Sequence, residues 1–354
     1  MTSNPKTNGA GSRRSAGFLD ADEVGRHWDL GPWQGWERTP SGSTNRSYFV
    51  TTDRGEFVAR VSNPRKTERS LAAEVALLEH LRARGVPVPA VVATRSGTPW
   101  ARVGDAFCLI TERVPGGHAD PTIPAHLGQA GRTLARFHRE TLDLPEFARP
   151  EPASELPALA EGPAVLDRLE ALAAELLDPG GLDRFRRAAD GLRPWFGAVL
   201  SSLTGDALPE ALTHGSLGRS AMLFDGERLV AVLDFERVAY EPRVLDLAYL
   251  LRSMTRNRGE RGAFFTARFG ALVGAYGDED PLSPSERARI PAAMQAQGLL
   301  RVRSKAVNLL TKHETVPETA EDVLGLLDKP MELELARIRW LAAHEDELVA
   351  AVAG

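Results

Sequence analysis

A histidine, a glycine and an aspartate further along the chain have the spacing of a phosphoryl-transfer site. His214 and Gly215 open the segment H-G-S-L-G-R-S-A-M-L-F-D, and Asp234 stands in the later segment L-D-F-E. Phosphoryl transfer requires carboxylate or amide ligands for Mg²⁺ and a side chain that orients the attacking hydroxyl. Asp234 is a carboxylate of the required type, and Glu236 assists only if the backbone turns it inward. We therefore take Asp234 as the candidate metal ligand.

Two positions of the first segment lack the side chains that this chemistry needs. A working site completes H-G-x with a carboxylate that accepts the hydroxyl proton, and it places a metal-binding amide five residues later. This chain has Ser216 and Ala221 at these places. A serine hydroxyl does not ionise usefully near neutral pH, and an alanine methyl group binds no metal. Arg219 adds a cation that would occupy part of the space of an ion, so we expect little dependence on Mg²⁺.

Ser216, Asp234 and His214 are the candidate catalytic residues. Ser216 and His214 stand two residues apart, but this spacing does not establish a nucleophile and its base without a third group that orients the histidine. Another acid could supply the missing carboxylate, and the candidates are Asp206, Glu236 and Glu241. Together with Arg219, Glu236 and Glu241 are also the candidate substrate or loop residues.

The nucleotide-binding half of such a site is expected near the N-terminus. The turn S-G-S-T-N-R-S contains Ser43, Thr44 and Asn45, whose small size lets backbone N–H groups approach phosphates, although ordinary hairpin turns have the same composition. Arg60, in F-V-A-R-V, is the candidate cation on the following strand, where kinases place V-A-I-K. Glu74, on the next predicted helix, is its candidate carboxylate partner. Arginine is not equivalent to lysine there, because its guanidinium is a planar fork.

The elements that must position these residues form a small mixed region followed by a helical one. Strands are predicted at Tyr48–Thr52, Phe57–Val61, Ala90–Thr94 and Phe107–Glu112, with a helix over Glu68–Arg84. Asp53-Arg54-Gly55 is the turn of a hairpin. The aromatic cluster Trp28, Trp33 and Trp36 is expected to pack within this region. Cys108, in an apolar run, is expected to be a buried strand residue.

After the linker V-P-G-G the pattern becomes helical. Helices are predicted at Leu127–Arg139, Ala164–Leu177 and Leu182–Leu203, and a strand pair at Met222–Phe224 and Leu229–Asp234 is joined through Asp225-Gly226. Pro150–Glu161 is expected to be a surface loop. The fold class is therefore α+β, and three parts are expected: a disordered leader at 1–17, a β-rich N-lobe at 18–116, and a helical C-lobe at 117–354 that contains the loop hairpin 212–236.

These segments, taken in order, resemble the aminoglycoside phosphotransferase and type II homoserine kinase family, which has a bilobal protein-kinase-like fold. The resemblance rests on S-G-S-T-N-R-S-Y-F-V-T-T-D-R-G-E-F-V-A-R-V, E-V-A-L-L-E-H-L-R-A-R-G-V-P-V-P, I-T-E-R-V-P-G-G, A-R-F-H, H-G-S-L-G-R-S-A-M-L-F-D-G and V-L-D-F-E-R-V-A-Y-E-P-R-V-L-D-L-A-Y-L-L. It departs from the family pattern H-G-D-x-x-x-x-N at Ser216 and Ala221.

The resemblance implies a role for each matched position. Arg60 faces the nucleotide phosphates and Glu74 anchors it, while the hinge from Thr111 through Glu112 to Val114 receives adenine through backbone groups. Asp234 binds Mg²⁺, and Asp246 holds the catalytic loop. A histidine at the place of His214 is structural in the family and packs beneath the loop. ATP is the cofactor implied, and the single clear ligand puts Mg²⁺ in doubt.

Composition narrows the classes of protein. The 354 residues carry a net charge of −5, which gives no sign of a nucleic-acid binder, and one cysteine excludes an internal disulfide. No run approaches the length of a membrane span, and the N-terminal residues lack the apolar core of a signal peptide. We expect a cytoplasmic protein without nucleic-acid or membrane partners.

Three functions remain open from the sequence. The first is a pseudokinase-like binding or pathway partner of another protein, with or without bound nucleotide, which the two missing side chains favour. The second is an ATP-dependent phosphotransferase that acts on a small molecule or a peptide with a non-standard site. The third is a biosynthetic tailoring enzyme that uses the kinase-like cleft for a different reaction through Ser216 or His214.

Overall fold

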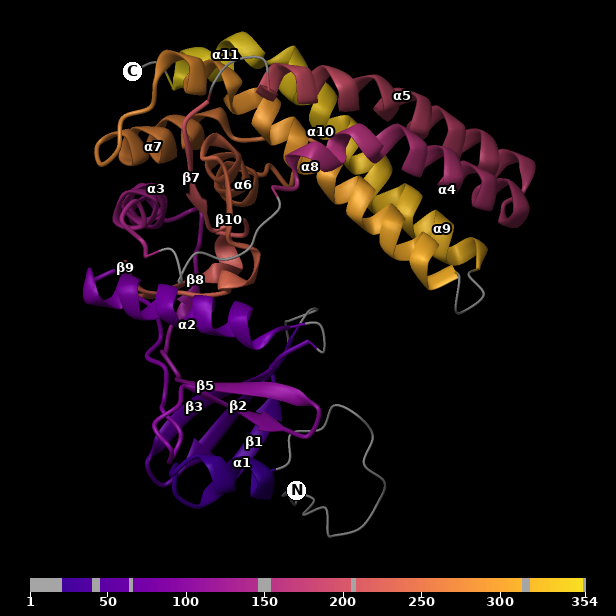
Figure 1. Cartoon of the computed structure of the whole chain (residues 1–354). Coiled ribbons are helices and arrows are strands. Elements are labelled where there is room, and N and C mark those ends of the chain that lie inside the picture. Colours follow the sequence, from indigo (N-terminus) through magenta and orange to yellow (C-terminus); the bar gives the residue numbers. More distant parts are fainter. Residues whose placement is uncertain are drawn as a thin grey trace, which may run out of the picture. The chain divides into compact units, whose positions relative to one another are not determined.

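The computed structural model describes residues 21–39, 45–63, 66–145, 154–204, 208–313 and 319–352, and these fall into two compact units (Figure 1). The N-terminal unit comprises Met1–Val75 and Pro89–Arg113, and the helical unit comprises Ala76–Val88 and Val114–Gly354. The expected leader at 1–17 and the candidates Ser43, Thr44 and Asp206 lie outside the described residues. The α+β fold class is confirmed.

The N-terminal unit is built on a five-stranded antiparallel sheet in the order β1-β2-β3-β5-β4. The predicted hairpin is present, since β2 and β3 pair from Arg46 with Val61 to Thr52 with Gly55. The strands are β1 (Trp33–Arg38), β2 (Arg46–Thr52), β3 (Gly55–Val61), β4 (Trp100–Val103) and β5 (Ala106–Glu112). Arg60 therefore lies on the central strand of the sheet, between Ser47 and Leu109.

The strand predicted at Ala90–Thr94 is wrong. Val91 makes only an isolated bridge with Thr111, and the chain then turns, because the N–H of Gly97 donates to the carbonyl of Thr94 at 2.9 Å. The Thr94 hydroxyl also lies 2.7 Å from that of Thr98 and holds this turn. Local hydroxyl contacts of this kind compete with a strand ladder.

The core of the N-terminal unit forms between helix α1 (Ala21–His27) and the sheet. Trp28 is 1% exposed and donates its indole N–H to the carbonyl of Val92 at 2.9 Å, so the packing interpretation is confirmed for this tryptophan. Trp36 is 39% exposed and meets Tyr48 edge to face. Cys108 is fully buried, and burial raises the pKa of its thiol to about 12, as expected of a core residue that is no nucleophile.

Helix α2 (Glu68–Ala83) is divided between the units, since its residues from Ala76 on belong to the helical unit. The main helices of that unit are α3 (Pro124–Glu140), α4 (Gly162–Leu176), α5 (Pro179–Thr204), α6 (Val244–Met254), α7 (Thr266–Gly277), α8 (Pro284–His313), α9 (Ala320–Leu326), α10 (Glu332–Ala343) and α11 (Glu345–Ala351). Helices α4 and α5 run side by side, and α8 packs against α5, α6 and α10 (Figure 1). The predicted helices within 127–203 are confirmed.

Two small sheets in the helical unit flank residues 214–221, the candidate catalytic loop. Strands β7 (Glu210–Thr213) and β10 (Ala239–Pro242) pair antiparallel, and β6 (Gly117–His118), β8 (Met222–Asp225) and β9 (Arg228–Val232) form the second sheet. The predicted hairpin through Asp225-Gly226 is therefore present. The surface loop predicted over Pro150–Glu161 is wrong where the structure describes it, because Leu156–Glu161 forms a 3₁₀ helix that buries Leu156 and Leu159.

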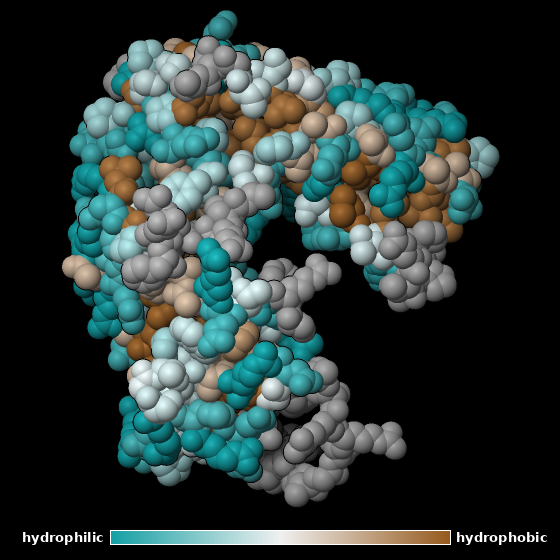
Figure 2. Space-filling view, in the orientation of Figure 1, coloured by the Kyte–Doolittle hydropathy of each residue, from teal (hydrophilic) through white to brown (hydrophobic). Residues whose placement is uncertain are grey.

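The surface is mixed. Figure 2 shows hydrophobic residues reaching the surface of the helical unit in short stretches among hydrophilic ones. Among the described residues, the large hydrophobic side chains that are exposed are Trp36, Leu142 and Phe265. None of the described helices has the length and apolar character that a membrane crossing requires.

Candidate active site

Asp246, near the start of α6, holds the backbone of the catalytic loop. Its buried carboxylate accepts hydrogen bonds from the N–H of His214 at 2.6 Å and from the N–H of Gly215 at 3.1 Å. His138 on α3 contacts the same carboxylate at 3.2 Å, and its other ring nitrogen meets the hydroxyl of Tyr276 at 2.8 Å. A negative charge in the interior needs such donors, so this network gives the loop a defined conformation.

His214 is fully buried and lies beneath the loop. Its Nε2 is 3.0 Å from the carbonyl oxygen of Leu233, which can only accept, so this nitrogen carries the proton and Nδ1 is the acceptor. Burial lowers the pKa of His214 more than the nearby charges of Asp246 and Asp234 raise it. The imidazole is therefore neutral near pH 7.

Ser216 contacts this histidine directly. The Ser216 Oγ is 3.3 Å from Nδ1 of His214 and 3.2 Å from the carbonyl oxygen of Asp234. Since a hydroxyl has one proton, Ser216 donates to one of these acceptors at a time and keeps lone pairs for another donor. The spacing of two residues, uninformative in the sequence, thus becomes a contact in which the Leu233 carbonyl orients the ring.

Asp234 has a backbone conformation that side chains seldom adopt. With φ 73° and ψ 55° it is the one non-glycine residue with positive φ among those the structure describes. Such a residue costs on the order of 1–3 kcal/mol, and strain of this kind concentrates at functional sites. Its side chain is exposed. Gly215 faces the next turn, where a Cβ atom would lie 2.3 Å from the Arg237 carbonyl oxygen, so these two segments approach closely.

Two other loop candidates, Ala221 and Arg219, have backbone partners of their own. Ala221 is 2% exposed, and its carbonyl accepts from the N–H of Leu233 at 2.8 Å, so it braces β9 and presents no ligand. Arg219 directs its Nε to the carbonyl of Ala119 at 3.1 Å. Glu236 is partly exposed. The guanidinium of Arg219 is thus engaged beside β6.

Glu241 lies behind the loop on β10. Its carboxyl oxygens accept from the hydroxyls of Thr213 and Ser154, each at 3.0 Å, and it is 7% exposed. Burial raises the pKa of Glu241, and the charges of Asp246 and Glu155 add to this effect. Both carboxyl oxygens of Glu241 are engaged beside Thr213, the residue before His214. Glu241 therefore supports the start of the loop.

The N-terminal unit brings together two cations and one carboxylate. Arg60 on β3 and Lys66 both form ion pairs with Glu74 on α2, Lys66 at 2.9 Å. Burial alone would raise the pKa of Glu74, but Arg60 and Lys66 together outweigh it and lower this pKa. The sequence pattern predicts the pairing of Arg60 with Glu74 but gives no role to Lys66. The signal that could have found it is a lysine between the strand and the helix that carry the other two.

Two further candidates, Asn45 and Glu112, lie in the same unit, and Val114 is the first residue of the helical unit after it. Asn45 is buried, and its Oδ1 accepts from the N–H of Asn63 at 2.8 Å, so it ties the start of β2 to the segment after β3. The N–H groups of Glu112 and Arg113 donate to the carbonyls of Ala90 and Glu56. Val114 follows, and the backbone hydrogen bonds of the described residues do not use its N–H.

The donor set suits one magnesium ion better than two. Mg²⁺ binds through one or two carboxylates together with substrate phosphates. Asp234, with Glu236 two residues away, meets this minimum, whereas Ala221 removes the amide of a second position. The described residues contain no group of three or more histidine, cysteine or acidic side chains placed to hold a metal alone.

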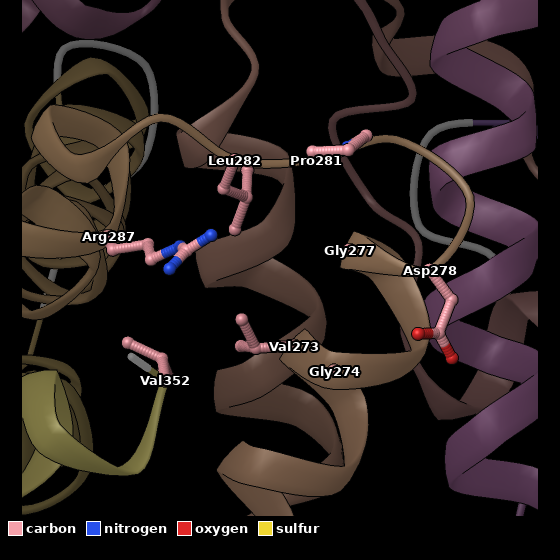
Figure 3. Close-up of a pocket in the computed structure, with 8 residues that line it drawn as sticks. All are labelled: Val273, Gly274, Gly277, Asp278, Pro281, Leu282, Arg287 and Val352. Atoms are coloured by element: carbon pink, nitrogen blue, oxygen red, sulfur yellow. The ribbon is translucent and has the colours of Figure 1, made fainter. Parts of the chain in front are cut away.

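A pocket in the helical unit lies between α7, α8 and α11 and away from the loop residues. It has a volume of about 170 Å³, and Figure 3 shows Arg287 reaching into it while the carboxylate of Asp278 points away. The other lining residues are Val273, Gly274, Gly277, Pro281, Leu282 and Val352. Ligand pockets usually measure 300–1,000 Å³, so this one is too small to be the substrate site.

Known proteins are similar to this chain in sequence and in fold. The chain is 29% identical over 268 residues to a homoserine kinase of Pseudomonas aeruginosa, covering 76% of this chain and 79% of that protein. An aminoglycoside phosphotransferase of Alicyclobacillus acidocaldarius superposes with a TM-score of 0.67 at 19% identity, covering 96% of this chain and 99% of that one. An amicoumacin kinase solved with AMP-PNP and Ca²⁺ superposes with a TM-score of 0.65 at 14% identity, covering 92% of each chain. Residues 35–284 match the phosphotransferase enzyme family, and the chain therefore belongs to that family.

Proposed function

We propose that this protein is an ATP-dependent phosphotransferase that phosphorylates a hydroxyl group of a small molecule. Its catalytic loop does so without the carboxylate and the amide of the family pattern. The contact between Ser216 and the neutral, buried His214 carries the proposal. A hydroxyl stands where the family has its carboxylate, and an acceptor for its proton lies behind it. The homoserine kinase and amicoumacin kinase relatives favour this function over the pseudokinase role that the missing side chains suggested.

Loss of the carboxylate need not abolish the reaction. The transition state of phosphoryl transfer is loose, so catalysis depends mainly on positioning and on stabilising charge. General-base assistance contributes about 10²–10⁴-fold. In the proposal, the acceptor hydroxyl donates to Ser216 Oγ, Ser216 donates to His214 Nδ1, and the Nε2–H of His214 remains on the Leu233 carbonyl. We therefore expect a slow enzyme that still positions the acceptor hydroxyl for transfer.

Different residues are assigned to the nucleotide and to the metal. Arg60 and Lys66, held by Glu74, supply positive charge for the nucleotide phosphates, and Val114 offers a backbone N–H for adenine. Asp234 and Glu236 are the residues that would hold Mg²⁺, which when bound neutralises charge on the transferred group. ATP supply and the single reduced thiol suit a cytoplasmic location, which we retain as part of the proposal.

Ala221 favours a second candidate, a protein that binds nucleotide without turning it over. A buried methyl group at the amide position removes a metal ligand and leaves the rest of the loop intact. The third candidate, a tailoring reaction at Ser216, finds less support, because a neutral histidine oriented only by a carbonyl is a weak base for a nucleophile.

Turnover with defined acceptors tests the proposal. The purified chain is incubated with ATP, Mg²⁺ and a panel of small alcohols that includes homoserine, and ADP release and acceptor phosphorylation are followed. We expect acceptor-dependent ADP release that Asp234→Asn abolishes and Ser216→Ala slows about tenfold to a hundredfold. The double variant Ser216→Asp with Ala221→Asn is expected to be faster. If nucleotide raises the melting temperature while no acceptor is phosphorylated, and only the double variant turns ATP over, the binding role is correct instead.

A further inference from the structure

Four arginines gather around one glutamate in the helical unit. Glu334 on α10 is 1% exposed and forms ion pairs with Arg252 of α6 and with Arg337, one turn along α10, at 2.7 Å. Arg301 of α8 lies 3.9 Å from the same carboxylate. Arg256, just after the end of α6, directs its Nε to the carbonyl of Arg252 at 2.9 Å. We call Arg252, Arg256, Arg301, Arg337 and Glu334 the arginine cluster.

The arginine cluster holds more positive charge than its acid balances. Three guanidinium groups approach a single carboxylate and that of Arg256 lies near the same charges, while across the described residues no other carboxylate forms an ion pair with any of the four. The two buried arginines, Arg252 and Arg337, are both paired with Glu334, whereas the more exposed Arg256 and Arg301 have no close carboxylate of their own. Partial burial of the Arg256 side chain, followed by repulsion from Arg337 and Arg252, lowers the pKa of Arg256 to about 10. The cluster therefore has a deficit of negative charge.

The packing around the arginine cluster leaves it accessible on one side. Gly298 of α8 makes room for the central ion pair, since a Cβ atom there would lie 2.9 Å from Oε2 of Glu334 and 3.4 Å from the guanidinium of Arg252. By contrast, the side chain of Arg301 is 49% exposed, and Arg256 also reaches solvent. An incoming group can meet these two arginines without displacing the buried pair.

Helix α6 connects the arginine cluster to the catalytic loop. The hydroxyl of Ser253 accepts the N–H of Arg219 in the loop at 2.9 Å. Ser253 is next to Arg252 of the cluster in sequence, so the loop and the cluster contact consecutive residues of α6. The cluster therefore lies close to the loop, as an acceptor that reaches both requires.

We infer that Arg256 and Arg301 form a subsite for an anionic group, a carboxylate or a phosphate, on the acceptor whose hydroxyl reaches the catalytic loop. Guanidinium groups bind both anions in a two-pronged geometry that a lysine cannot reproduce. The inference rests on the proposed function for the identity of the ligand. The anion site itself follows from the charge and contacts of the arginine cluster and requires no turnover.

Melting temperature in the presence of inorganic phosphate or acetate, at constant ionic strength, tests the site without any reaction. Arg256→Gln removes the unpaired cation, and Arg258→Gln, an exposed arginine in the same loop, is the matched control. We expect phosphate or acetate to stabilise the wild type and the control, with at least tenfold weaker binding to Arg256→Gln. Without anion, Arg256→Gln is expected to melt above the wild type, because the repulsion is relieved. The stronger of the two anions identifies the group.

The results separate the inference from the proposed function. If Arg256→Gln and Arg258→Gln respond alike to both anions, or if Arg256→Gln melts below the wild type without anion, the subsite is wrong, whatever the turnover. If the chain phosphorylates acceptors, Arg256→Gln is expected to raise KM about tenfold for acceptors bearing the anionic group and to leave neutral alcohols unchanged. An equal KM change for both kinds of acceptor contradicts the subsite while leaving the phosphotransferase proposal intact.

Discussion

The pairing of Glu74 with two cations makes a strong prediction about the N-terminal unit. Glu74→Gln retains the size of the side chain and removes its charge, so Arg60 and Lys66 lose their shared partner. The side chain of Glu74 is 3% exposed, and those of Arg60 and Lys66 are 16% and 19% exposed. Both cations are thus largely removed from water and depend on this carboxylate.

The magnitude follows from these exposures. Breaking a buried ion pair by removing one partner costs about 3–5 kcal/mol. The two cations retain some contact with solvent, so we expect the lower end, about 3 kcal/mol. For a unit of this size, 1 kcal/mol shifts the melting temperature by roughly 4–8 °C. In Glu74→Gln the melting temperature of the N-terminal unit should therefore lie more than roughly 10 °C below its value in the wild type.

The pH dependence gives a second measurement. The pKa of Glu74 is lowered in the folded chain, so its contribution is present above the ordinary value of 4.5 and is lost as pH falls through the folded value. The difference between wild type and Glu74→Gln should therefore shrink in acid. Urea unfolding followed by circular dichroism at several pH values measures it.

A matched control comes from the same helix. Glu79 of α2 is exposed, and Glu79→Gln should change the free energy of unfolding by less than about 0.5 kcal/mol. Nucleotide affinity should fall in Glu74→Gln and remain in Glu79→Gln. Equal stabilities of the two variants at neutral pH would refute the reasoning, because Arg60 and Lys66 would then not depend on the carboxylate.

Three more predictions concern the loop. Asp234→Gly and Asp234→Ala both remove the carboxylate and should abolish turnover, but calorimetry should show the alanine variant about 1 kcal/mol less stable, since only glycine adopts positive φ freely. Equal stability would mean that the left-handed backbone is not retained in solution. Asp246→Asn should cost about 2 kcal/mol in urea unfolding and lower kcat, because two N–H groups lose a charged acceptor; unchanged values of both would contradict its role. For Glu241, whose pKa burial raises, the stabilising contribution is present below its ordinary value of 4.5 and is lost as pH rises through the folded value. Glu241→Gln should therefore become more stable relative to the wild type as pH rises from acid to neutral. If it instead becomes less stable relative to the wild type over this range, the carboxyl is ionised in the fold.

Much of the fold could be predicted from the residues themselves. The hairpin at Asp53–Gly55, the helix from Glu68 and the turn at Asp225-Gly226 follow from local patterns, and the structure has all three. The strands at Trp33–Arg38 and Trp100–Val103 were missed. Both lie at the edges of the sheet, and the first shows almost no alternation of buried and exposed residues. Without that alternation no sequence pattern identifies a strand.

The candidate site divides in the same way. The sequence alone identified the family resemblance, the absence of a carboxylate and an amide at Ser216 and Ala221, and Asp234 as the remaining ligand. It could not show that Ser216 touches a neutral His214, because this depends on a carbonyl from another strand, that of Leu233. Nor could it join Lys66 to Glu74.

The arginine cluster shows most clearly why the sequence alone does not reveal which residues come together. Arg256, Arg301 and Arg337 come from three separate segments of the helical unit, and each reads in the sequence as an ordinary charge on a helix or loop. Hydrogen bonding and hydrophobic periodicity act over one or two turns, so residue order alone predicts most of the elements. Which charges share one low-dielectric space, and therefore which pKa values shift, is decided only when the helices pack.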